Sequence, residues 1–329
     1  MKGDDMKSMR LFGSVGGGWS SREVDKLVKA ANEAPLWCTR RPWVVEPHRR
    51  SAELFQVPLG DGEADDDRAR LLSCGAALTN LRLAVLVTGW HALVDFADTP
   101  HRGGLIATVR AGHRRSPTAA ELARFEAIGQ VGVSHVVPRP GSLDPVLSAR
   151  LAASHWWRGT RLEPLTDPRD AAILGELVLS AIRRMEGELT AADELAAWSA
   201  PRPRRDRWSG ASADTAAGAG TSRRSWLSSR SAVAARIASE QVMAVVTGGD
   251  MPSDHLGAGA AIQSACLAAQ AMGLISQPVV ELVSSPEARA DLGVRLGLRG
   301  YPQALLRVGP SMAGVVGLTP SPRTATSWS

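Results

Sequence analysis

A run of small residues that occurs twice constrains the fold of this chain more than any other feature. Residues 72–90 and 256–274 align without a gap at a constant offset of 184 residues. Both copies have the composition of a helix that is apolar on most sides, so each must be buried against another element. The economical arrangement packs the two helices against each other, so that two similar halves of one chain form a pseudo-dimer. A chance resemblance between alanine-rich helices is the alternative. Seven of the nineteen positions are identical, namely Leu72/Leu256, Gly75/Gly259, Ala76/Ala260, Ala77/Ala261, Leu83/Leu267, Ala84/Ala268 and Gly89/Gly273.

The composition indicates a globular protein. The 329 residues are 44% hydrophobic, which is enough to bury a full core. The net charge is +5, with basic clusters at residues 202–207 and 223–230. The chain has no zinc finger, no aromatic RNA-binding motif and no basic leucine zipper, so nucleic acid is not an expected partner.

Cysteine usage and the apolar runs indicate a cytoplasmic protein. The three cysteines form neither a disulfide framework nor a CxxC metal site. Cys74 and Cys266 lie inside the repeated helices, where a free cysteine is usually a small buried side chain. The longest apolar run, residues 81–94, is broken by polar residues, and the N-terminus has no apolar signal segment. We therefore expect neither secretion nor a membrane span.

Hydrophobic periodicity adds helices and strands around the repeat, which predicts an α+β chain. Ser20 or Ser21 should cap the first helix, which ends at Ala34-Pro35 and carries Glu23 in its first turn. Further helices are expected at residues 68–88, from residue 118, and at 144–157, 167–188 and 286–296. Strands are expected at 44–46, 52–57, 91–96, 132–137, 241–246, 279–283 and 303–308.

Three local patterns each allow two interpretations. The acidic residues 61–67 suggest either a metal site or a solvated helix entrance. Residues 155–157, His-Trp-Trp, suggest either a stacking platform or aromatic side chains that fill the core. Asp254-His255 suggests part of a hydrolase triad, but the chain has no GxSxG motif and no well-placed nucleophile, so we set that function aside.

The loop after the first helix resembles a motif of the nitroreductase superfamily. The helix ends at Ala34-Pro35, and the loop closes at Pro42-Trp43 as it enters a strand. This order is similar to the APSxxNxQPW segment of the long, mycobacterial Acg-like branch of that superfamily. Leu36, Thr39 and Arg41 stand where the family has Ser, Asn and Gln.

A basic stretch before the helix at residue 118 adds to the resemblance. By itself, this stretch of three arginines and a serine suggests either an anion site at a helix entrance or a solvated basic turn. Acg-like proteins carry RRTxRxPF here, with arginines that hold the flavin phosphate. Arg110 and Arg114 match the first and third arginines of that motif, while Ala111 replaces the second, unless the run Arg114-Arg115-Ser116 takes over its role. The sequence PQALLRVG and a tail that ends in Pro-Arg at Arg323 are similar to the C-terminal part of the family, where such an arginine reaches the flavin phosphate.

The resemblance implies a nitroreductase-like fold with one FMN between two halves. Residues 1–19 would form a flexible tail, residues 20–100 the first half and residues 101–329 the second half. The arginines would hold the phosphate, and the loop of the other half would approach the ring. The cofactor-binding residues assigned in this way are Arg110, Arg114, Ser116, Arg323, Pro35, Leu36, Trp37, Ser276 and Gln277; no catalytic residue and no metal ligand is assigned.

Residues 199–231, rich in Ser, Ala, Gly and Arg, bear on the choice between two functions. Trp208 and Trp226 favour a lid over the flavin, whereas the composition is equally typical of a disordered or partner-binding segment. With a lid, and without the family's polar loop residues, we predict a monomeric flavoprotein that stores FMN and turns over poorly. The alternative is a nitroreductase or quinone reductase that takes hydride from NAD(P)H in a ping-pong reaction and passes it to a nitroaromatic or quinone.

Overall fold

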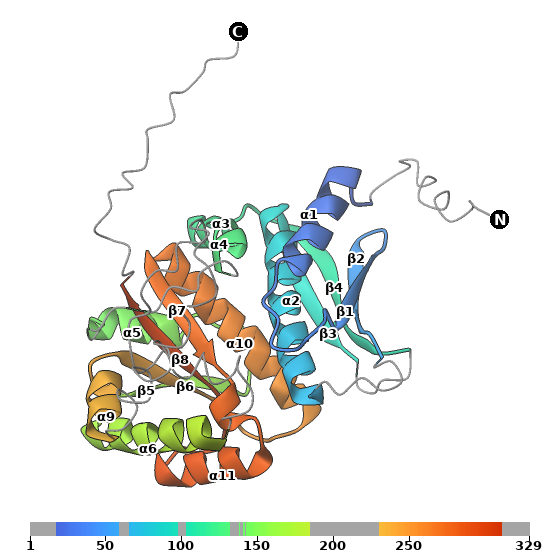
Figure 1. Ribbon diagram of the computed structural model, residues 1–329. Helices are drawn as coiled ribbons and strands as arrows, with labels where there is room; N and C mark the ends of the chain where they lie inside the picture. The colour runs from blue at the N-terminus through green and yellow to red at the C-terminus, as the bar shows by residue number, and fades with distance from the viewer. Residues whose placement is uncertain are drawn as a thin grey trace, which may run out of the picture. The chain divides into compact units, whose positions relative to one another are not determined.

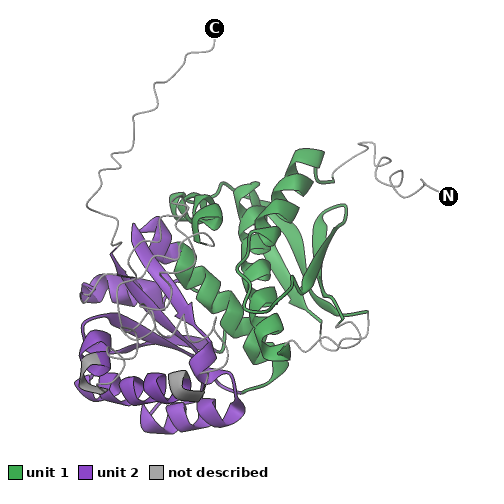
Figure 2. Cartoon of the chain, in the orientation of Figure 1, with its two compact units in different colours: residues 1–132, 155–159, 250–267 green, residues 133–154, 160–249, 268–329 purple. Residues whose placement is uncertain are grey.

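The computed structural model describes residues 18–58, 66–97, 103–131, 138, 141, 143–184 and 230–310. Its helices and strands group into two compact units, coloured green and purple in Figure 2. Unit 1 comprises residues 1–132, 155–159 and 250–267, and unit 2 comprises residues 133–154, 160–249 and 268–329.

Unit 1 contains an antiparallel sheet of four strands together with helices from three parts of the chain (Figure 1). Its elements are α1 (Ser21–Asn32), β1 (Trp43–Pro47), β2 (Ser51–Gln56), α2 (Asp67–Val87), β3 (Trp90–Phe96), β4 (Leu105–Arg114), α3 (Ala119–Glu126), α4 (Ile128–Val131) and α10 (Pro252–Ala271) as far as Leu267. The strand order is β1-β2-β4-β3, and α2 packs on α1 and on this sheet. One face of the sheet is therefore covered, whereas Val44, Leu93 and Arg110 on the other face are exposed.

Three helices of unit 1 begin where side chains cap their free backbone N–H groups. Ser20 and Glu23 form a capping box at α1, in which each side chain accepts a hydrogen bond from the other residue's backbone N–H. Thr118 and Glu121 form the same box at α3, and Asp66 caps α2. The predicted start of the first helix is confirmed, with Ser20 as its cap.

Helix α2 lies at the centre of the core of unit 1. Its length and apolar composition would allow it to cross a membrane, but 83% of its most apolar stretch is buried inside the protein. Leu72, Leu78 and Leu81 are fully buried. This burial on most sides is what the sequence of the repeat predicts.

The two copies of the small-residue helix, α2 and α10, pack against each other within unit 1. A Cβ atom on Gly75 would overlap the carbonyl oxygen of Leu256, and a Cβ atom on Gly259 would overlap the carbonyl oxygen of Leu72. Gly259 and Leu256 are the repeat counterparts of Gly75 and Leu72, so the two contacts are related by a local two-fold, as in an isologous interface. Only glycine allows the two backbones to approach so closely.

The polar contacts between α2 and α10 do not follow this two-fold. Thr79 Oγ1 donates a hydrogen bond to the Ala260 carbonyl oxygen over 3.1 Å. Gln263, the repeat counterpart of Thr79, instead donates from Nε2 to Asn80 Oδ1 over 2.9 Å. The two copies of the helix therefore share their small residues and differ in their polar ones.

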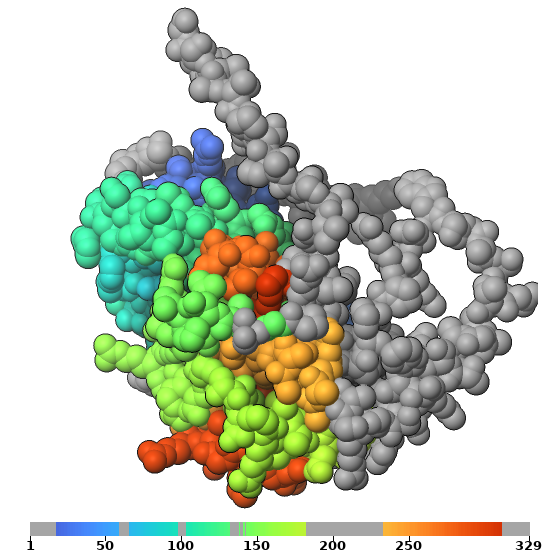
Figure 3. Space-filling model, turned by 90° about the vertical axis from the view of Figure 1, so that its left-hand side faces the viewer, coloured from blue at the N-terminus to red at the C-terminus, as the bar shows by residue number. Residues whose placement is uncertain are grey.

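Unit 2 contains a second antiparallel sheet of four strands. Its elements are α5 (Pro145–Ala152), β5 (Thr160–Leu165), α6 (Pro168–Arg184), α9 (Arg230–Ala238), β6 (Gln241–Thr247), the end of α10, β7 (Leu274–Val279), the 3₁₀ turn η2 (Glu281–Val283), α11 (Pro286–Arg295) and β8 (Tyr301–Pro310). Figure 3 shows α9 beside α6 on the surface of this unit. The central strands β6 and β8 are buried along nearly their whole length.

The two sheets have the same topology. The strand orders are β1-β2-β4-β3 and β5-β6-β8-β7. Strands β5, β6, β7 and β8 therefore occupy the positions that β1, β2, β3 and β4 occupy in the first sheet. In chain order, the long small-residue helix connects the second and third strands of each sheet: α2 lies between β2 and β3, and α10 lies between β6 and β7. The prediction of an α+β chain with two similar halves is confirmed.

The structure differs from the expected elements at five places. Strand β4 was not among the expected strands, because its residues were interpreted only as the lead-in to the next helix. Strand β5 was missed because Pro164 interrupts it, which an edge strand tolerates. Helix α9 begins within the stretch that was expected to be a loop. The helix expected at residues 144–157 ends at Ala152, and the strand expected at residues 279–283 begins at Leu274 and gives way to η2.

Several predicted features fall outside the described residues. They are Arg323, most of the N-terminal tail, residues 61–65 of the acidic run, the strand at 132–137, and most of the candidate lid with Trp208 and Trp226. The boundary between residues 100 and 101 stays a prediction, although it places β3 and β4, which pair in one sheet, in different halves.

Candidate functional site

Two of the three arginines assigned to the flavin phosphate, Arg110 and Arg114, lie on opposite faces of the sheet of unit 1. Arg110 in β4 pairs in register with the exposed Leu93, and it forms an ion pair with Asp95 over 2.6 Å. A bulge then shifts the register, so that Arg114 pairs with the buried Trp90. The structure therefore does not bring these two guanidinium groups together, and their assignment to one phosphate stays a prediction.

Arg114 is held by a stack of aromatic and cationic side chains. Its guanidinium carbon lies 3.7 Å from the ring centre of Trp90. Arg50 lies over the same ring at 4.8 Å, and Trp19 meets it edge-on at 6.3 Å. Nη1 of Arg114 donates to the Thr88 carbonyl oxygen over 3.5 Å. Stacking on an aromatic face leaves the other N–H groups at the rim of the guanidinium able to bind an anion. Since Arg114 and Ser116 are both exposed, this end of β4 can present donors to a phosphate.

The neighbouring Arg115 is occupied by an acidic residue of the next helix. Its Nη1 and Nη2 atoms contact the two carboxylate oxygens of Glu121 at 3.0 and 2.5 Å. Burial raises the pKa of Glu121, but the hydrogen bonds from Arg115 and Thr118 outweigh it and hold the pKa below its usual value. At the start of α3 the Glu121 N–H donates to Thr118 Oγ1 and the Thr118 N–H donates to the Glu121 carboxylate. Because Arg115 is engaged with the same carboxylate, it is not available to take over the role of the family's second arginine.

The loop after α1 is fixed by a backbone contact to α2. The Trp37 N–H donates to Ser73 Oγ over 2.9 Å, and Ser73 Oγ in turn donates to the Ala69 carbonyl oxygen over 2.8 Å. Leu36 is 46% exposed, whereas Pro35 and Trp37 are half-buried. An exposed leucine beside a fixed backbone suits contact with a flat apolar ring, which is the role that the resemblance gives to this loop.

The two tryptophans after α5 combine both interpretations of their pattern. Trp156 and Trp157 pack against the core of unit 1, where Trp156 Nε1 donates to Thr79 Oγ1 over 3.2 Å and the Trp157 ring fills the space left by Gly257. They also line, with Phe96 and Arg158, an open pocket of about 400 Å³. The aromatic pair therefore both packs against the core and presents ring surface to the solvent.

Gln277, one of the cofactor residues assigned in unit 2, belongs to a buried charged network. Arg307 is fully buried, donates to Gln277 Oε1 over 2.8 Å and forms a two-bonded ion pair with Glu240 at 2.7 and 2.8 Å. Burial lowers the pKa of Arg307, and Glu240 counteracts this. Ser276 lies next to Gln277 in β7 and pairs with Val308.

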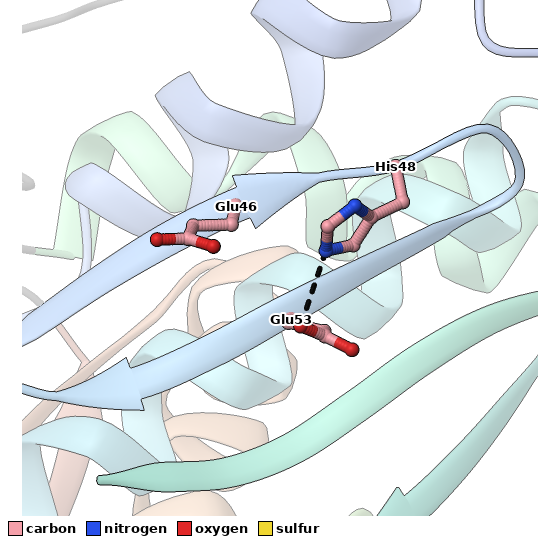
Figure 4. Close-up of side chains that lie close together, drawn as sticks. All are labelled: Glu46, His48 and Glu53. Atoms are coloured by element: carbon pink, nitrogen blue, oxygen red, sulfur yellow. Dashed lines mark hydrogen bonds and ion pairs between the residues drawn. The ribbon is translucent and has the colours of Figure 1, made fainter. Parts of the chain in front are cut away.

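Sequence reasoning missed two charged groups. The Arg307–Glu240 pair carried a usable signal, since a lone arginine inside the apolar run Ala304–Val308 must be paired to be buried. The second group, Glu46, His48 and Glu53 in the β1–β2 hairpin (Figure 4), becomes visible only once the strand register is known. Asp254 and His255 are not the pair that their sequence suggests, because His255 Nε2 contacts Asp250 at 2.9 Å.

Comparison with known proteins gives similarity over almost the whole chain. No protein-family model matches. Two Mycobacterium tuberculosis proteins, named "Putative NAD(P)H nitroreductase Rv3131" in strain ATCC 25618 / H37Rv and "Putative NAD(P)H nitroreductase MT3217" in strain CDC 1551 / Oshkosh, are each 28% identical to this chain. Each alignment spans 323 residues, which is 92% of this chain and 90% of the relative. This similarity supports the nitroreductase superfamily, and the Acg-like branch stays a prediction.

Solved structures with partial similarity carry related names. A nitroreductase with bound FMN from Bacteroides fragilis NCTC 9343 has 13% identity and a TM-score of 0.38, covering 63% of this chain and 98% of its own. Nitroreductase A from Vibrio parahaemolyticus has 11% identity and a TM-score of 0.35, covering 58% of this chain and 68% of its own. NADPH:FMN oxidoreductase from Vibrio harveyi, complexed with NAD+, has 11% identity and a TM-score of 0.34, covering 57% and 68%.

Proposed function

We propose that this chain is an FMN-binding, nitroreductase-like flavoprotein. The observation that carries the proposal is the similarity to two mycobacterial proteins named as NAD(P)H nitroreductases, which extends over 92% of the chain. The duplicated helix supports it, because the resemblance implies two similar halves around one cofactor site. We also propose that the chain acts as a monomer in the cytoplasm.

The chemistry of the exposed side chains in unit 1 suits FMN. Arg114 and Ser116 can donate hydrogen bonds to the phosphate, and the stack on Trp90 orients the guanidinium of Arg114 for that role. Leu36 can contact the ring. Bound FMN supplies the chemistry itself, since it accepts hydride from a nicotinamide and passes electrons on, while the protein positions it and tunes its surroundings.

Within this proposal we favour storage of FMN over rapid turnover. The family's Ser, Asn and Gln, which would offer polar contacts, are replaced by the apolar Leu36 and by Thr39 and Arg41, both of which are exposed. A lid formed by residues 199–231, with Trp208 and Trp226 over the ring, would restrict access of a second substrate. Ping-pong turnover needs an open face above the flavin, so a covered site would store the cofactor.

The alternative within the same proposal is an NAD(P)H-dependent nitroreductase or quinone reductase. The names of the two mycobacterial relatives favour it. It uses the same cofactor site but requires that hydride enter and leave, with a nitroaromatic or quinone as acceptor.

Titration of the purified protein with FMN, then with NADPH, tests both functions. We expect a yellow protein that binds one FMN per chain; a colourless preparation that takes up no FMN would overturn the flavin proposal. Rapid reduction by NADPH and reoxidation by a nitroaromatic would favour the enzyme over storage. Deletion of residues 210–220 should speed FMN exchange if these residues belong to a lid, and an unchanged exchange rate would remove the lid from the proposal.

A further inference from the structure

We propose that Glu46, His48 and Glu53 form a binding site for one divalent transition-metal ion, with Zn²⁺ as the best match. Each of the three side chains offers one ligand atom, and these atoms all lie within 4.8 Å of one another. Figure 4 shows them grouped at the end of the β1–β2 hairpin. Nothing in the proposed flavin chemistry uses these residues.

The strand register explains why the three side chains meet. Glu46 and Glu53 are direct partners across the antiparallel pair. His48 follows Glu46 by two residues and therefore points to the same face of the sheet. This is the face opposite to the one where Ala52 and Leu54 are fully buried, so all three ligands point away from the core.

The hairpin is held in place before any ion binds. The His48 N–H donates to the Ser51 carbonyl oxygen over 2.8 Å and closes the turn. Trp19 clamps the same turn from outside, with its backbone N–H on the Arg49 carbonyl oxygen at 2.9 Å and its Nε1 on the Ser51 carbonyl oxygen at 3.2 Å. A site on a fixed backbone loses less entropy when it binds a ligand.

The two carboxylates at the site are not fully neutralised by the protein, which favours binding of a cation. Glu46 and Glu53 repel each other, because like charges directly opposite in a sheet are destabilising. His48 Nε2 contacts Glu53 Oε2 at 3.1 Å. Among the residues that the structure describes, the Glu46 carboxylate makes no hydrogen bond or ion pair. Arg110, which pairs with Ser51 in the neighbouring strand, forms an ion pair with Asp95.

The ligand set selects the kind of ion. One imidazole nitrogen and two carboxylate oxygens match Zn²⁺, which binds both at about 2.0–2.2 Å and tolerates water in a fourth position. Tetrahedral ligands at such bond lengths lie about 3.4 Å apart. The ligand atoms must therefore approach by about 1.4 Å at most, a movement that exposed side chains can make by rotation. Ca²⁺ needs six to eight oxygen ligands and Mg²⁺ a near-octahedral set, so three ligands with one nitrogen disfavour both.

Isothermal titration of untagged, chelator-stripped full-length protein with ZnCl₂ tests the site. We expect one Zn²⁺ per chain, no heat from CaCl₂ at the same concentrations, and binding at least about tenfold weaker in H48Q and in E46Q. H91Q is the matched control, because His91 stacks on His113 in the same sheet, with ring centres 4.9 Å apart, and so offers an imidazole outside the proposed site. Zn²⁺ should also raise the Tm of the wild type but not that of H48Q.

Several results would overturn the proposal. They are binding that survives both H48Q and E46Q, binding lost in H91Q, and no binding below millimolar Zn²⁺. Circular dichroism of the variants checks that they fold. The visible spectrum of Co²⁺ added to the wild type gives a readout that needs no variant: intense d–d bands support a four-coordinate site, and the weak spectrum of hydrated Co²⁺ contradicts it.

Discussion

Gly75 in α2 and Gly259 in α10 each face the backbone of the helix that carries the other. Any side chain at either position would overlap a carbonyl oxygen, that of Leu256 or that of Leu72. The two positions are 184 residues apart in sequence and equivalent in the repeat. The close approach of the two helices therefore depends on two glycines, one from each copy of the repeat.

Alanine at either glycine should destabilise unit 1. We expect G75A and G259A each to lower the free energy of unfolding by about 1–3 kcal/mol through overpacking, although alanine is the better helix former by about 1 kcal/mol. Urea denaturation followed by circular dichroism measures the change. G129A is the control, because the nearest atom to its new Cβ would be a carboxylate oxygen of Glu33 at 3.7 Å.

The double variant G75A/G259A probes the local two-fold. The first alanine already separates the helices, so the second should cost less than it does alone, by more than about 0.5 kcal/mol. Full additivity would show that the two contacts are independent and would contradict a shared interface.

Removing one partner of the buried pair in unit 2 should be costly. E240Q leaves the fully buried Arg307 without a counter-charge, which should lower the free energy of unfolding by about 3–5 kcal/mol. The control is E163Q in the exposed pair with Arg161, which should cost about 1 kcal/mol or less. Equal effects in the two variants would contradict the importance of burial here.

The cysteines should differ in reactivity. Burial first, and then the nearby Cys38, raise the pKa of Cys74 to about 12, so Cys74 carries almost no thiolate at pH 8. Cys266 is buried, while Cys38 is half-buried. We expect one thiol to react quickly with a disulfide reagent in the native protein and three in urea. The fast reaction should vanish in C38S, and a second fast thiol in the native state would contradict this assignment.

Acid should remove the contribution of Glu121. Its pKa is held below the usual value by Arg115 and Thr118 despite burial, so its stabilising effect is present above the unfolded-state pKa of about 4.3 and is lost as the pH falls through the lower folded-state pKa. We expect E121Q to be less stable than the wild type by about 1–2 kcal/mol at pH 7 and equally stable near pH 2. Urea denaturation across this range measures the difference, with E126Q at an exposed position of the same helix as the control.

Loss of a phosphate ligand should weaken FMN retention. If the proposed function holds, R114A and R323A should each reduce the affinity by about 1.5–3 kcal/mol for a lost charge-assisted bond. R110A is expected to do the same if its assignment is right, although Arg110 lies on the other face of the sheet and pairs with Asp95. Fluorescence titration with FMN measures the affinity, and K29A on the exposed side of α1 is the control.

The repeat could be predicted from the sequence because its two copies share small residues at a constant offset. The burial of both helices, the Ser20 cap of the first helix and the strands near residues 44–46 and 52–57 follow from local rules, and the structure confirms them. Strand β5 could not be predicted in the same way, since Pro164 argues against a strand unless its position at the sheet edge is known.

The candidate site was less accessible from sequence than the fold. Spacing placed Arg110 and Arg114 four residues apart, but a bulge in β4 decides that they point to opposite faces. Likewise, the ion pair between Arg115 and Glu121 becomes visible only in the structure. Such contacts between side chains depend on strand register and packing, which the pattern of residues along the sequence does not specify.

The unequal polar contacts of Thr79 and Gln263 show what a duplicated chain gains over two separate copies. In a symmetric homodimer every substitution appears on both sides of the axis at once, so a change that helps one side must be tolerated by the other. Here each counterpart can change alone. One half is thereby free to specialise while the other preserves the inherited contact, and asymmetry can evolve without loss of assembly.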